Sequence, residues 1–325
     1  MAMTRWGILG TGSIAHKFAG GLLSARNGEL VAVGSRTQES ADAFGEEFAI
    51  PRRHGSYEAL AADSDVDAVY ISSPHPMHKA NSLLCLRGGK AVLCEKPFAV
   101  NQRDAREVAE FARANGLFCM EAMWTRFLPA LVRMREILAE GTIGDVRMVL
   151  ADFSFRCGWN PEGRLLNPQL AGGGLLDVGV YCVSLASMVL GEPSQVTSLA
   201  HLGETGVDEH SGVLFGYEGG ELAVLVSGVR TMTPMEATIC GTEGRIRLHH
   251  PWWKCDRLTL TVGGSDETLD LPFEGNGYNY EAEEVGRCLA AGKTESDVMP
   301  LDETLRVVGL MDKIRDLWGL KYPME

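Results

Sequence analysis

The segment Gly172–Tyr181 (GGGLLDVGVY) places two ionisable groups, Asp177 and Tyr181, in a stretch that is almost wholly apolar from residue 175 to 190. A four-residue spacing puts both on one helical face. A carboxylate in so apolar a helix is costly unless it is paired or faces a polar cleft. The pattern therefore predicts a buried helix that ends before Gly191 and presents an acid and a phenol to a cleft. A helix-start aspartate with a core tyrosine would give the same pattern.

Two further polar segments each follow a short apolar run. Ser72–His78 (SSPHPMH) follows AVYI, and Glu95-Lys96-Pro97 follows AVLC. If both runs are parallel strands, the two segments lie at the carboxyl edge of one sheet, where open α/β sheets bind ligands. Lys96 then supplies a cation and Pro97 a rigid backbone, although a solvated loop fits Glu-Lys-Pro equally well. His75 and His78 have HxxH spacing without further ligands, so we expect them to line a ligand pocket rather than a metal site.

Gly10–Ala15 (GTGSIA) fits the G-x-G-x-x-A pattern between a strand and a helix. Gly10 allows the tight turn, Gly12 lets the backbone approach a pyrophosphate, and Ala15 permits close packing of helix on strand. Ser13 and Ile14 begin the helix, whose N–H groups and dipole favour a phosphate. The segment predicts a dinucleotide site, with a purely structural glycine turn as the alternative.

The end of the next strand indicates which dinucleotide binds. Leu30–Gly34 is followed by Ser35, Arg36 and Thr37, with no acid for the ribose hydroxyls of NAD. Arg36 can contact a 2′-phosphate bidentately, so NADP is predicted over NAD; a surface arginine that begins a helix is the alternative. The predicted cofactor-binding residues are Gly10, Gly12, Ser13, Ile14, Ser35, Arg36, Thr37, Ser73, Pro74, His75, His78, Glu95, Lys96 and Pro97.

Oxidation of a secondary alcohol needs a base for the hydroxyl proton while hydride leaves for the nicotinamide. An ordinary tyrosine, with a pKa of about 10, is a weak base at neutral pH, but a neighbouring ammonium such as that of Lys96 favours the phenolate. We therefore expect Tyr181 to be the general acid/base, helped by Lys96, and Asp177 to orient Lys96 or a substrate hydroxyl. Proton transfer by Lys96 itself stays open. The predicted substrate-binding residues are Trp124, Arg126, Arg164, Asp177 and Tyr181.

The elements that must position these residues fall into two groups. The first third of the chain alternates apolar runs with helical patterns, as a parallel sheet does. After about residue 122, short strands separated by glycine turns indicate an antiparallel sheet. We predict an α/β protein, with a doubly wound Rossmann domain at 1–122 that binds NADP and an α+β domain with an open, mostly antiparallel sheet at 123–325 that binds substrate and oligomerises. The last helix could pack back on the first domain. His249–Trp253 (HHPWW) is expected to be packing at a sheet edge.

The bulk composition restricts the function classes. The 325 residues carry 30 Lys and Arg against 43 Asp and Glu, a net charge of −13, which disfavours nucleic-acid and membrane partners. Eight cysteines without a CxxC pair indicate a reducing compartment. No signal peptide is recognisable, and no apolar stretch is expected to approach the roughly 18 to 20 residues that cross a bilayer. A cytoplasmic protein is predicted.

GTGSIA, CEKP, GGGLLDVGVY and the GTEGRI turn at Gly241–Ile246 together resemble the Gfo/Idh/MocA oxidoreductase family over nearly the whole chain. The resemblance implies a Rossmann domain followed by an open sheet, Lys96 near the reacting carbon, a cis Pro97 and dimerisation through the exposed sheet face. Many members carry histidine where this chain has Tyr181. That variant, with SPHPMH and MEAMWTRF at 120–127, resembles the dimeric dihydrodiol dehydrogenases and NADP-dependent D-xylose dehydrogenases of the family.

The resulting hypothesis is an NADP-dependent dehydrogenase of sugars or trans-dihydrodiols that forms a homodimer or higher homo-oligomer and binds no metal. Two alternatives remain. A keto-sugar reductase, such as an anhydrofructose-type enzyme, would run the same chemistry backwards. A non-catalytic NADP-sensing regulator would have no need of Lys96, Asp177 and Tyr181 together, so their presence favours an enzyme.

Overall fold

The computed structural model describes residues 3–325, which form two compact units. The first contains the chain up to Trp124 together with Glu274–Thr304, and the second contains Thr125–Phe273 and Leu305–Glu325. The sequence analysis placed one boundary near residue 122. Residues 274–304, which it assigned to the second domain, lie in the first unit.

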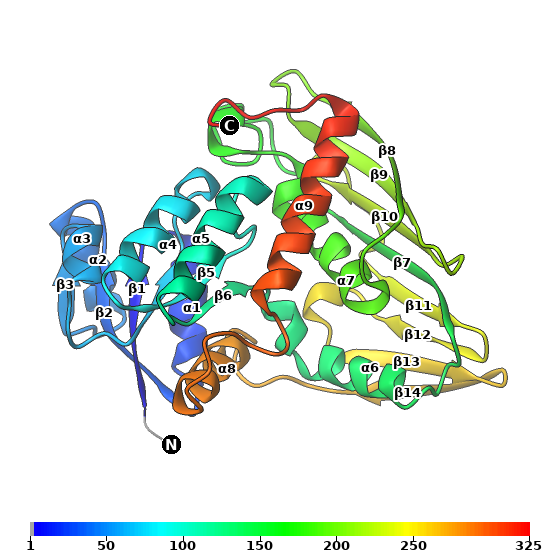
Figure 1. Cartoon of the computed structure of the whole chain (residues 1–325), viewed down its shortest axis with the longest axis horizontal. Coiled ribbons are helices and arrows are strands. Elements are labelled where there is room, and N and C mark those ends of the chain that lie inside the picture. The colour runs from blue at the N-terminus through cyan, green and yellow to red at the C-terminus, as the bar shows by residue number, and fades with distance from the viewer. Residues whose placement is uncertain (1–2) are drawn as a thin grey trace. The chain divides into compact units, whose positions relative to one another are not determined.

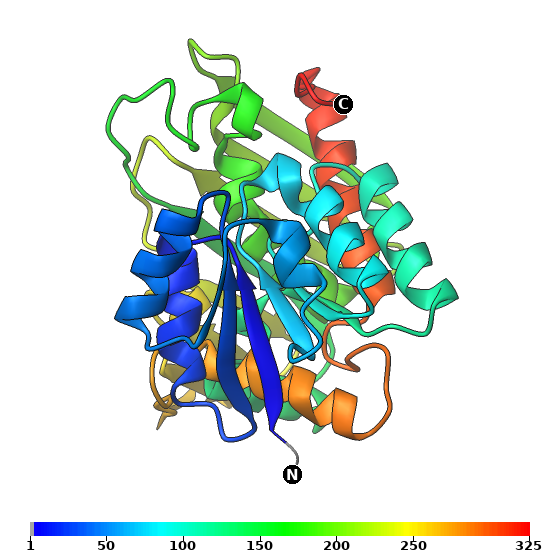
Figure 2. The ribbon, with the colours of Figure 1, turned by 90° about the vertical axis from the view of Figure 1, so that its left-hand side faces the viewer.

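The first unit is built on a six-stranded parallel sheet in the order β3-β2-β1-β4-β5-β6 (Figure 2). Helices α1, α2 and α8 cover one face and α3, α4 and α5 the other, as repeated right-handed crossovers in both directions from β1 require. The strands are β1 (Thr4–Leu9), β2 (Gly28–Gly34), β3 (Arg52–His54), β4 (Ala68–Ile71), β5 (Ala91–Glu95) and β6 (Cys119–Ala122). The helices are α1 (Ser13–Leu22), α2 (Gln38–Glu47), α3 (Tyr57–Ala61), α4 (His78–Arg87), α5 (Gln102–Ala114) and α8 (Asn279–Ala290).

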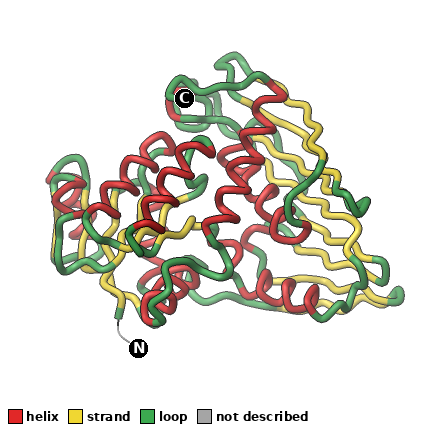
Figure 3. The backbone as a smooth tube through the Cα atoms, in the orientation of Figure 1, coloured by secondary structure: helices red, strands yellow, loops and turns green. Residues whose placement is uncertain are grey.

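The second unit is built on an eight-stranded sheet in the order β14-β13-β12-β11-β7-β10-β9-β8 (Figure 3). Only the β7–β10 pair is parallel within this sheet. Its strands are β7 (Val146–Ser154), β8 (Gln195–Leu202), β9 (Asp208–Gly216), β10 (Leu222–Gly228), β11 (Ala237–Gly241), β12 (Gly244–Leu248), β13 (Arg257–Val262) and β14 (Ser265–Asp270). In this order β11 and β7 occupy the centre of the sheet, and β10 lies next to β7.

Helices cover one face of this second sheet (Figure 1). They are α6 (Pro129–Ala139), the π-helical turn η4 (Leu175–Gly179), α7 (Val180–Leu190) and α9 (Leu301–Trp318), which belongs to this unit from residue 305 on. The strands alternate accordingly: in β10, Ala223 and Leu225 are buried, whereas Leu222, Val224 and Val226 are exposed. In the part of the chain that the structure describes, no helix of this unit lies on the other face.

The predicted fold class is confirmed: a parallel Rossmann-type sheet and a mostly antiparallel sheet with helices. Two strands were missed. β3 (RRH) has three residues and no apolar run, and β14 (SDETLD) is an exposed edge strand without apolar alternation. The predicted buried helix over 175–190 is confirmed as a continuous helix that ends at Leu190. Its first turn, η4, is π-helical, and a Cβ at Gly179 in this turn would lie 2.8 Å from Ser227 Oγ of β10.

The expectation that no apolar stretch approaches a membrane-spanning length is wrong. Pro168–Leu190 is long and apolar enough by length and composition, with a mean hydropathy of 1.7. However, 83% of that window is buried inside the protein. The segment is apolar because it passes through the core between the sheet and the other helices of its unit.

Candidate active site

The turn between β1 and α1 has the geometry of a pyrophosphate cradle. Gly10 has a φ of 105°, and a Cβ there would lie 2.8 Å from Ser72 Oγ, so glycine is required. No described atom lies within 4 Å of the position that a Cβ of Gly12 would take. No side chain caps the N-terminus of α1, which begins at Ser13. The N–H groups of this helix end therefore face open space, which fits a dinucleotide phosphate.

Arg36 at the end of β2 is exposed and forms no ion pair with another described residue. Beside it, Ser35 Oγ and Thr11 Oγ1 lie 3.3 Å apart. Thr37 has a different task from the one predicted: its Oγ1 accepts the Ser40 N–H at 3.2 Å and caps α2. The free guanidinium and the two neighbouring hydroxyls, of Thr11 and Ser35, fit a 2′-phosphate.

His78 ties the two predicted loops of the first unit together. Its ring is fully buried; Nδ1 lies 2.8 Å from the Pro97 carbonyl oxygen and Nε2 lies 2.7 Å from that of Ser73. Burial lowers the pKa of His78, because it disfavours the charged ring more than the two carbonyls favour it. The prediction that His78 lines the cofactor pocket is therefore corrected: it has no exposed surface and positions both loops.

Glu95 holds the backbone of the segment that contains Lys96 and Pro97. Its carboxylate is buried, accepts the Tyr70 hydroxyl on one oxygen and the Lys96 backbone N–H on the other at 3.1 Å. Burial and the Glu95 charge raise the pKa of Tyr70 well above its ordinary value. The Lys96–Pro97 peptide bond is cis, as the family resemblance implies. Glu95 thus holds the backbone that carries Lys96, whose own side chain is partly exposed.

In the second unit, three consecutive glycines bring three segments against the start of η4. A Cβ at Gly172 would lie 2.8 Å from the Leu165 carbonyl oxygen, and one at Gly174 would lie 3.2 Å from Gly228 Cα in β10. Gly173 has a φ of 119°, and a Cβ there would collide with Asp208 Oδ1. Each glycine permits a different close approach, which places η4, and with it Asp177, against the sheet.

Asp177 is paired with Arg164. Arg164 Nη1 donates to Asp177 Oδ1; the Asp177 side chain is 6% exposed and that of Arg164 is 61% exposed. The loop that carries Arg164 is held by a hydrogen bond from Gly173 N to the Leu165 carbonyl oxygen at 2.9 Å. The sequence predicted a carboxylate that is paired or faces a cleft, and the structure supplies the pair. Arg164, which was predicted to bind substrate, thus contacts Asp177, another predicted site residue.

Aromatic rings adjoin Tyr181. Phe153, near the end of β7, lies 5.4 Å from the Tyr181 ring and stacks on Trp253 with centroids 3.4 Å apart. Sequence analysis missed both residues and took HHPWW for packing. That interpretation holds for Trp252, which is buried and donates to the Asp152 carbonyl oxygen. Trp253 instead belongs to the surroundings of Tyr181; the only available signal was an aromatic doublet after a proline.

The other two predicted substrate residues lie in different units. Trp124 belongs to the first unit and stacks on Tyr278 at 4.5 Å. Arg126 belongs to the second unit, is buried, and donates to Ser184 Oγ at 3.0 Å and to the Ser184 carbonyl oxygen at 2.8 Å. Arg126 therefore anchors the middle of α7, the helix that begins beside Tyr181.

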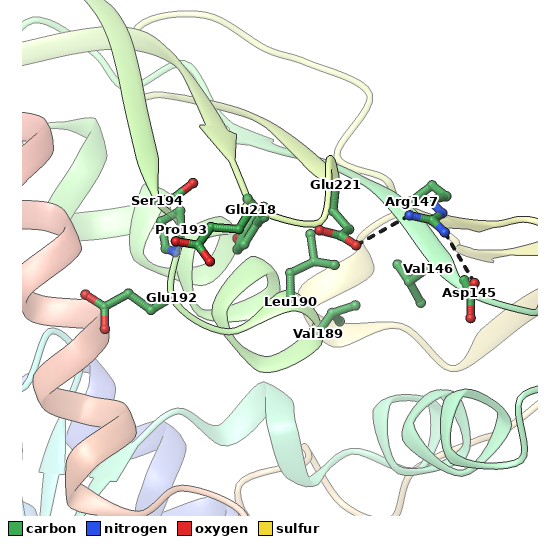
Figure 4. A pocket seen from close by; sticks show the side chains of 11 residues that line it. Asp145, Val146, Arg147, Val189, Leu190, Glu192, Pro193, Ser194, Glu218 and Glu221 are labelled. Carbon is green, nitrogen blue, oxygen red and sulfur yellow. Dashed lines mark hydrogen bonds and ion pairs between the residues drawn. The ribbon is translucent and has the colours of Figure 1, made fainter.

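A hollow of about 670 Å³ lies at the far end of α7, beside Val189 and Leu190 (Figure 4). Its rim is acidic, and Arg147 pairs there with Asp145 and Glu221 at 3.3 and 3.6 Å. Tyr181 lies eight residues before Val189, roughly 12 Å along the helix. This hollow is therefore separate from the candidate site.

Residues 4–123 match the profile described as "Oxidoreductase family, NAD-binding Rossmann fold", and residues 131–247 match the "GFO/IDH/MocA C-terminal domain". The chain belongs to this oxidoreductase family. It is 39% identical to proteins named trans-1,2-dihydrobenzene-1,2-diol dehydrogenase from Mus musculus and Homo sapiens, over 99% of this chain and 98% of each relative. The crystal structure of KijD10, a 3-ketoreductase from Actinomadura kijaniata with NADP and TDP-benzene, is 26% identical with a TM-score of 0.86 and 97% coverage of both chains.

Family membership makes the chain an oxidoreductase with a dinucleotide-binding domain, as predicted from GTGSIA. A Caulobacter crescentus aldose-aldose oxidoreductase, 23% identical with a TM-score of 0.88 and 97% coverage of both chains, shares the Gfo/Idh/MocA fold. Among residues 3–325, no cluster of three or more His, Cys, Asp or Glu side chains has an arrangement that could hold a metal ion.

The buried state of His78 predicts a pH dependence of stability. Because its folded-state pKa lies below the ordinary value of about 6.5, the unfolded chain binds a proton first as the pH falls. The free energy of unfolding should therefore decrease below about pH 6.5. In His78→Asn the free energy of unfolding should fall less steeply below pH 6.5. At pH 7.5 it should be lower than in the unmodified protein by about 1–3 kcal/mol. Thermal unfolding between pH 5 and 7.5 checks this, with exposed His250→Asn as control; an unchanged pH dependence in His78→Asn would contradict it.

Proposed function

We propose that this chain is an NADP-dependent dehydrogenase that oxidises one secondary alcohol of a trans-dihydrodiol to a carbonyl group. The observation that carries the proposal is the full-length similarity, 39% identity, to relatives named for this activity. The alcohol loses a hydride to the nicotinamide and a proton to the protein, so that the dinucleotide and a base together account for both hydrogens.

NADP is the proposed cofactor because the cradle at Gly12 fits a dinucleotide and the unpaired Arg36 fits its additional phosphate. The similar 3-ketoreductase was crystallised with NADP. Bound NADP⁺ supplies the hydride acceptor. We assign its binding to the turn Gly10–Ile14, to Thr11, Ser35 and Arg36, and to the loops of Ser73–His75 and Lys96–Pro97, which Glu95 and His78 hold in place.

Lys96, Asp177 and Tyr181 are proposed to act on the same substrate hydroxyl. Tyr181 accepts its proton, and the Lys96 ammonium favours the phenolate form that this requires. Asp177, which pairs with Arg164, orients Lys96 or the second hydroxyl of the diol. The similar 3-ketoreductase has also been crystallised with one lysine changed to alanine and with one tyrosine changed to phenylalanine, the same two residue types.

The substrate is proposed to be a cyclic diol because the surroundings of Tyr181 are aromatic. The Phe153–Trp253 stack offers a flat apolar surface beside the phenol, which suits a planar unsaturated ring. The Arg164–Asp177 pair offers the polar atoms for a vicinal hydroxyl.

A sugar substrate is the second candidate, in either direction of the reaction. It is favoured by the similarity to a 3-ketoreductase whose structure holds a TDP-linked group. A D-xylose dehydrogenase or a keto-sugar reductase would use the same three residues, with the polar Arg164–Asp177 pair facing ring hydroxyls.

We further propose a homodimer formed through the uncovered face of the second sheet. Val224 lies directly opposite Leu214 on β9 and Leu150 on β7. These three side chains are between 37% and 41% exposed, and Leu222 and Val226 flank Val224 on the same strand face. A continuous apolar patch of this kind is typical of an interface between subunits. The helices of this unit cover the opposite face of the sheet, where Ala223 and Leu225 of β10 are buried.

A cytoplasmic location is proposed from the thiols. All eight cysteines are free, six of them buried and Cys157 and Cys240 partly exposed, which fits a reducing compartment.

Tyr181→Phe should lower kcat for a trans-dihydrodiol by about 10²–10⁴-fold, because it removes the proton acceptor, and should leave the Kd for NADP⁺ unchanged. NADPH formation by the purified protein measures this. Tyr280→Phe, which removes a hydroxyl from α8, is the matched control. Near-normal turnover of Tyr181→Phe would rule out its role; a much larger loss in Lys96→Met than in Tyr181→Phe would assign the proton transfer to Lys96.

Arg36→Ala should raise the KM for NADP⁺ by roughly 10–100-fold, since a charge-assisted contact to the 2′-phosphate is lost. Turnover with NAD⁺ should change little. Arg103→Ala, another exposed arginine of the same unit, should leave both cofactors unaffected. Equal KM values for NADP⁺ in Arg36→Ala and the unmodified protein would exclude the assignment.

Val224→Glu should convert the dimer into a monomer, because it places a charge at the centre of the apolar patch. Light scattering after size-exclusion chromatography gives the mass directly. Leu317→Glu changes an exposed leucine of α9 and should leave the dimer intact. A dimer in both variants would show that the subunits meet elsewhere.

A further inference from the structure

A buried polar pair lies against the turn that carries Asp177. Asp208 of β9 has no exposed surface, and Tyr322, near the C-terminal end, is 2% exposed. Both belong to the second unit, and neither was singled out by the sequence analysis. Burial of a carboxyl and a phenol is costly unless their polar atoms are used, so their contacts indicate their task.

The two side chains hold opposite ends of the Gly172–Leu175 backbone. Asp208 Oδ2 accepts the Leu175 N–H at 2.6 Å, and the Tyr322 hydroxyl donates to the Gly172 carbonyl oxygen at 2.6 Å. Gly173 lies between them with a positive φ, in a position where a Cβ would collide with Asp208. The glycine permits the close approach of Asp208, and the carboxyl and the phenol each bind one end of the turn.

Tyr322 is itself held rigidly. Arg315 of α9, with a side chain only 4% exposed, donates to Glu325 Oε2 and to Asp312 Oδ1, each at 2.6 Å. Glu325 in turn accepts the Tyr322 backbone N–H at 2.8 Å. The short segment after α9 thus holds the Tyr322 hydroxyl in position to donate to the Gly172 carbonyl oxygen.

We propose that Asp208 and Tyr322 are positioning residues of the active site, which fix the Gly172–Leu175 backbone and thereby the directions of Asp177 and Tyr181. Asp177 and Tyr181 follow Leu175 by two and six residues within the continuous helix of η4 and α7. A rotation of the first turn is transmitted to both side chains. The inference rests on the proposed function, because it assigns these two residues their role through Asp177 and Tyr181.

The hydrogen bond from the Leu175 N–H needs an acceptor oxygen at Asp208, and an amide side chain also supplies one. Burial raises the pKa of Asp208 to about 7, although Arg315 and the N–H groups of Leu175 and Gly174 favour the ionised form. Tyr322 also faces it, and its pKa is raised well above the ordinary value by burial and by the Asp208 charge. An uncharged asparagine should therefore replace Asp208, whereas alanine should not.

The test compares Asp208→Ala, Asp208→Asn and Tyr322→Phe with the unmodified protein, using a trans-dihydrodiol and NADP⁺. Asp208→Ala and Tyr322→Phe should lower kcat by roughly 10–100-fold, because a misplaced proton acceptor costs about that much. The KM for the diol should change less than threefold and the Kd for NADP⁺ not at all. Asp208→Asn should restore kcat to within threefold. Tyr280→Phe serves as the control for loss of a tyrosine hydroxyl.

Each outcome separates this inference from the proposed function. If Tyr181→Phe is inactive while folded Asp208→Ala and Tyr322→Phe both keep full kcat, the positioning role is overturned and the proposed function stands. If Tyr181→Phe is fully active, the proposed function itself fails. Should Asp208→Ala not fold, Tyr322→Phe decides, since it removes a single oxygen atom: a reduced kcat with unchanged NADP⁺ binding supports the role, and an unchanged kcat refutes it.

Discussion

Asp208 is a carboxyl group without any exposed surface, and the second unit keeps it there because the backbone of a glycine-rich turn supplies the N–H that it needs. Gly172, Gly173 and Gly174 each lack a Cβ at a point where another segment comes close: the Arg164 loop, Asp208, and β10. A side chain at any of them would push the turn away from the sheet. The acid, the phenol and the arginine of the candidate site all depend on this packing, because each is attached to, or held by, that turn.

In the first unit, too, buried polar side chains hold the backbone of the candidate site in place. Two loops must lie at fixed positions at the carboxyl edge of a parallel sheet, yet neither is long enough to pack a core of its own. His78 bridges the loops through two carbonyl oxygens, and Glu95 uses both carboxylate oxygens to connect β4, through Tyr70, with the backbone of Lys96. His78 and Glu95, both predicted to bind the cofactor, are buried and hold these loops in place.

Sequence patterns predicted most elements to within a few residues, including helix 78–87 and helix 301–318 without error. They failed where the physical signal is weak. β14 lies at a sheet edge, where neither face has to be apolar, and β3 has three residues. Segment 175–190 is one continuous helix, as predicted, but its uniform apolar composition gives no sign that the first turn is π-helical. The Arg164–Asp177 pair was not predicted because nothing near Arg164 in sequence identifies Asp177 as its partner.

Alone, the sequence determined the dinucleotide-binding domain and the order of the two sheets, and it predicted a preference for NADP at Arg36 and roles for Lys96, Asp177 and Tyr181. These features are local: a glycine spacing, a strand end or a helical period depends on residues within a few positions of one another. Only the tertiary structure showed that Phe153 lies beside Tyr181 and stacks on Trp253, that Arg164 pairs with Asp177, and that Asp208 and Tyr322 hold the Gly172–Leu175 turn. Each of these contacts joins segments separated by more than ten residues, and which distant side chains meet is decided by how the sheet packs on its helices rather than by any spacing along the chain.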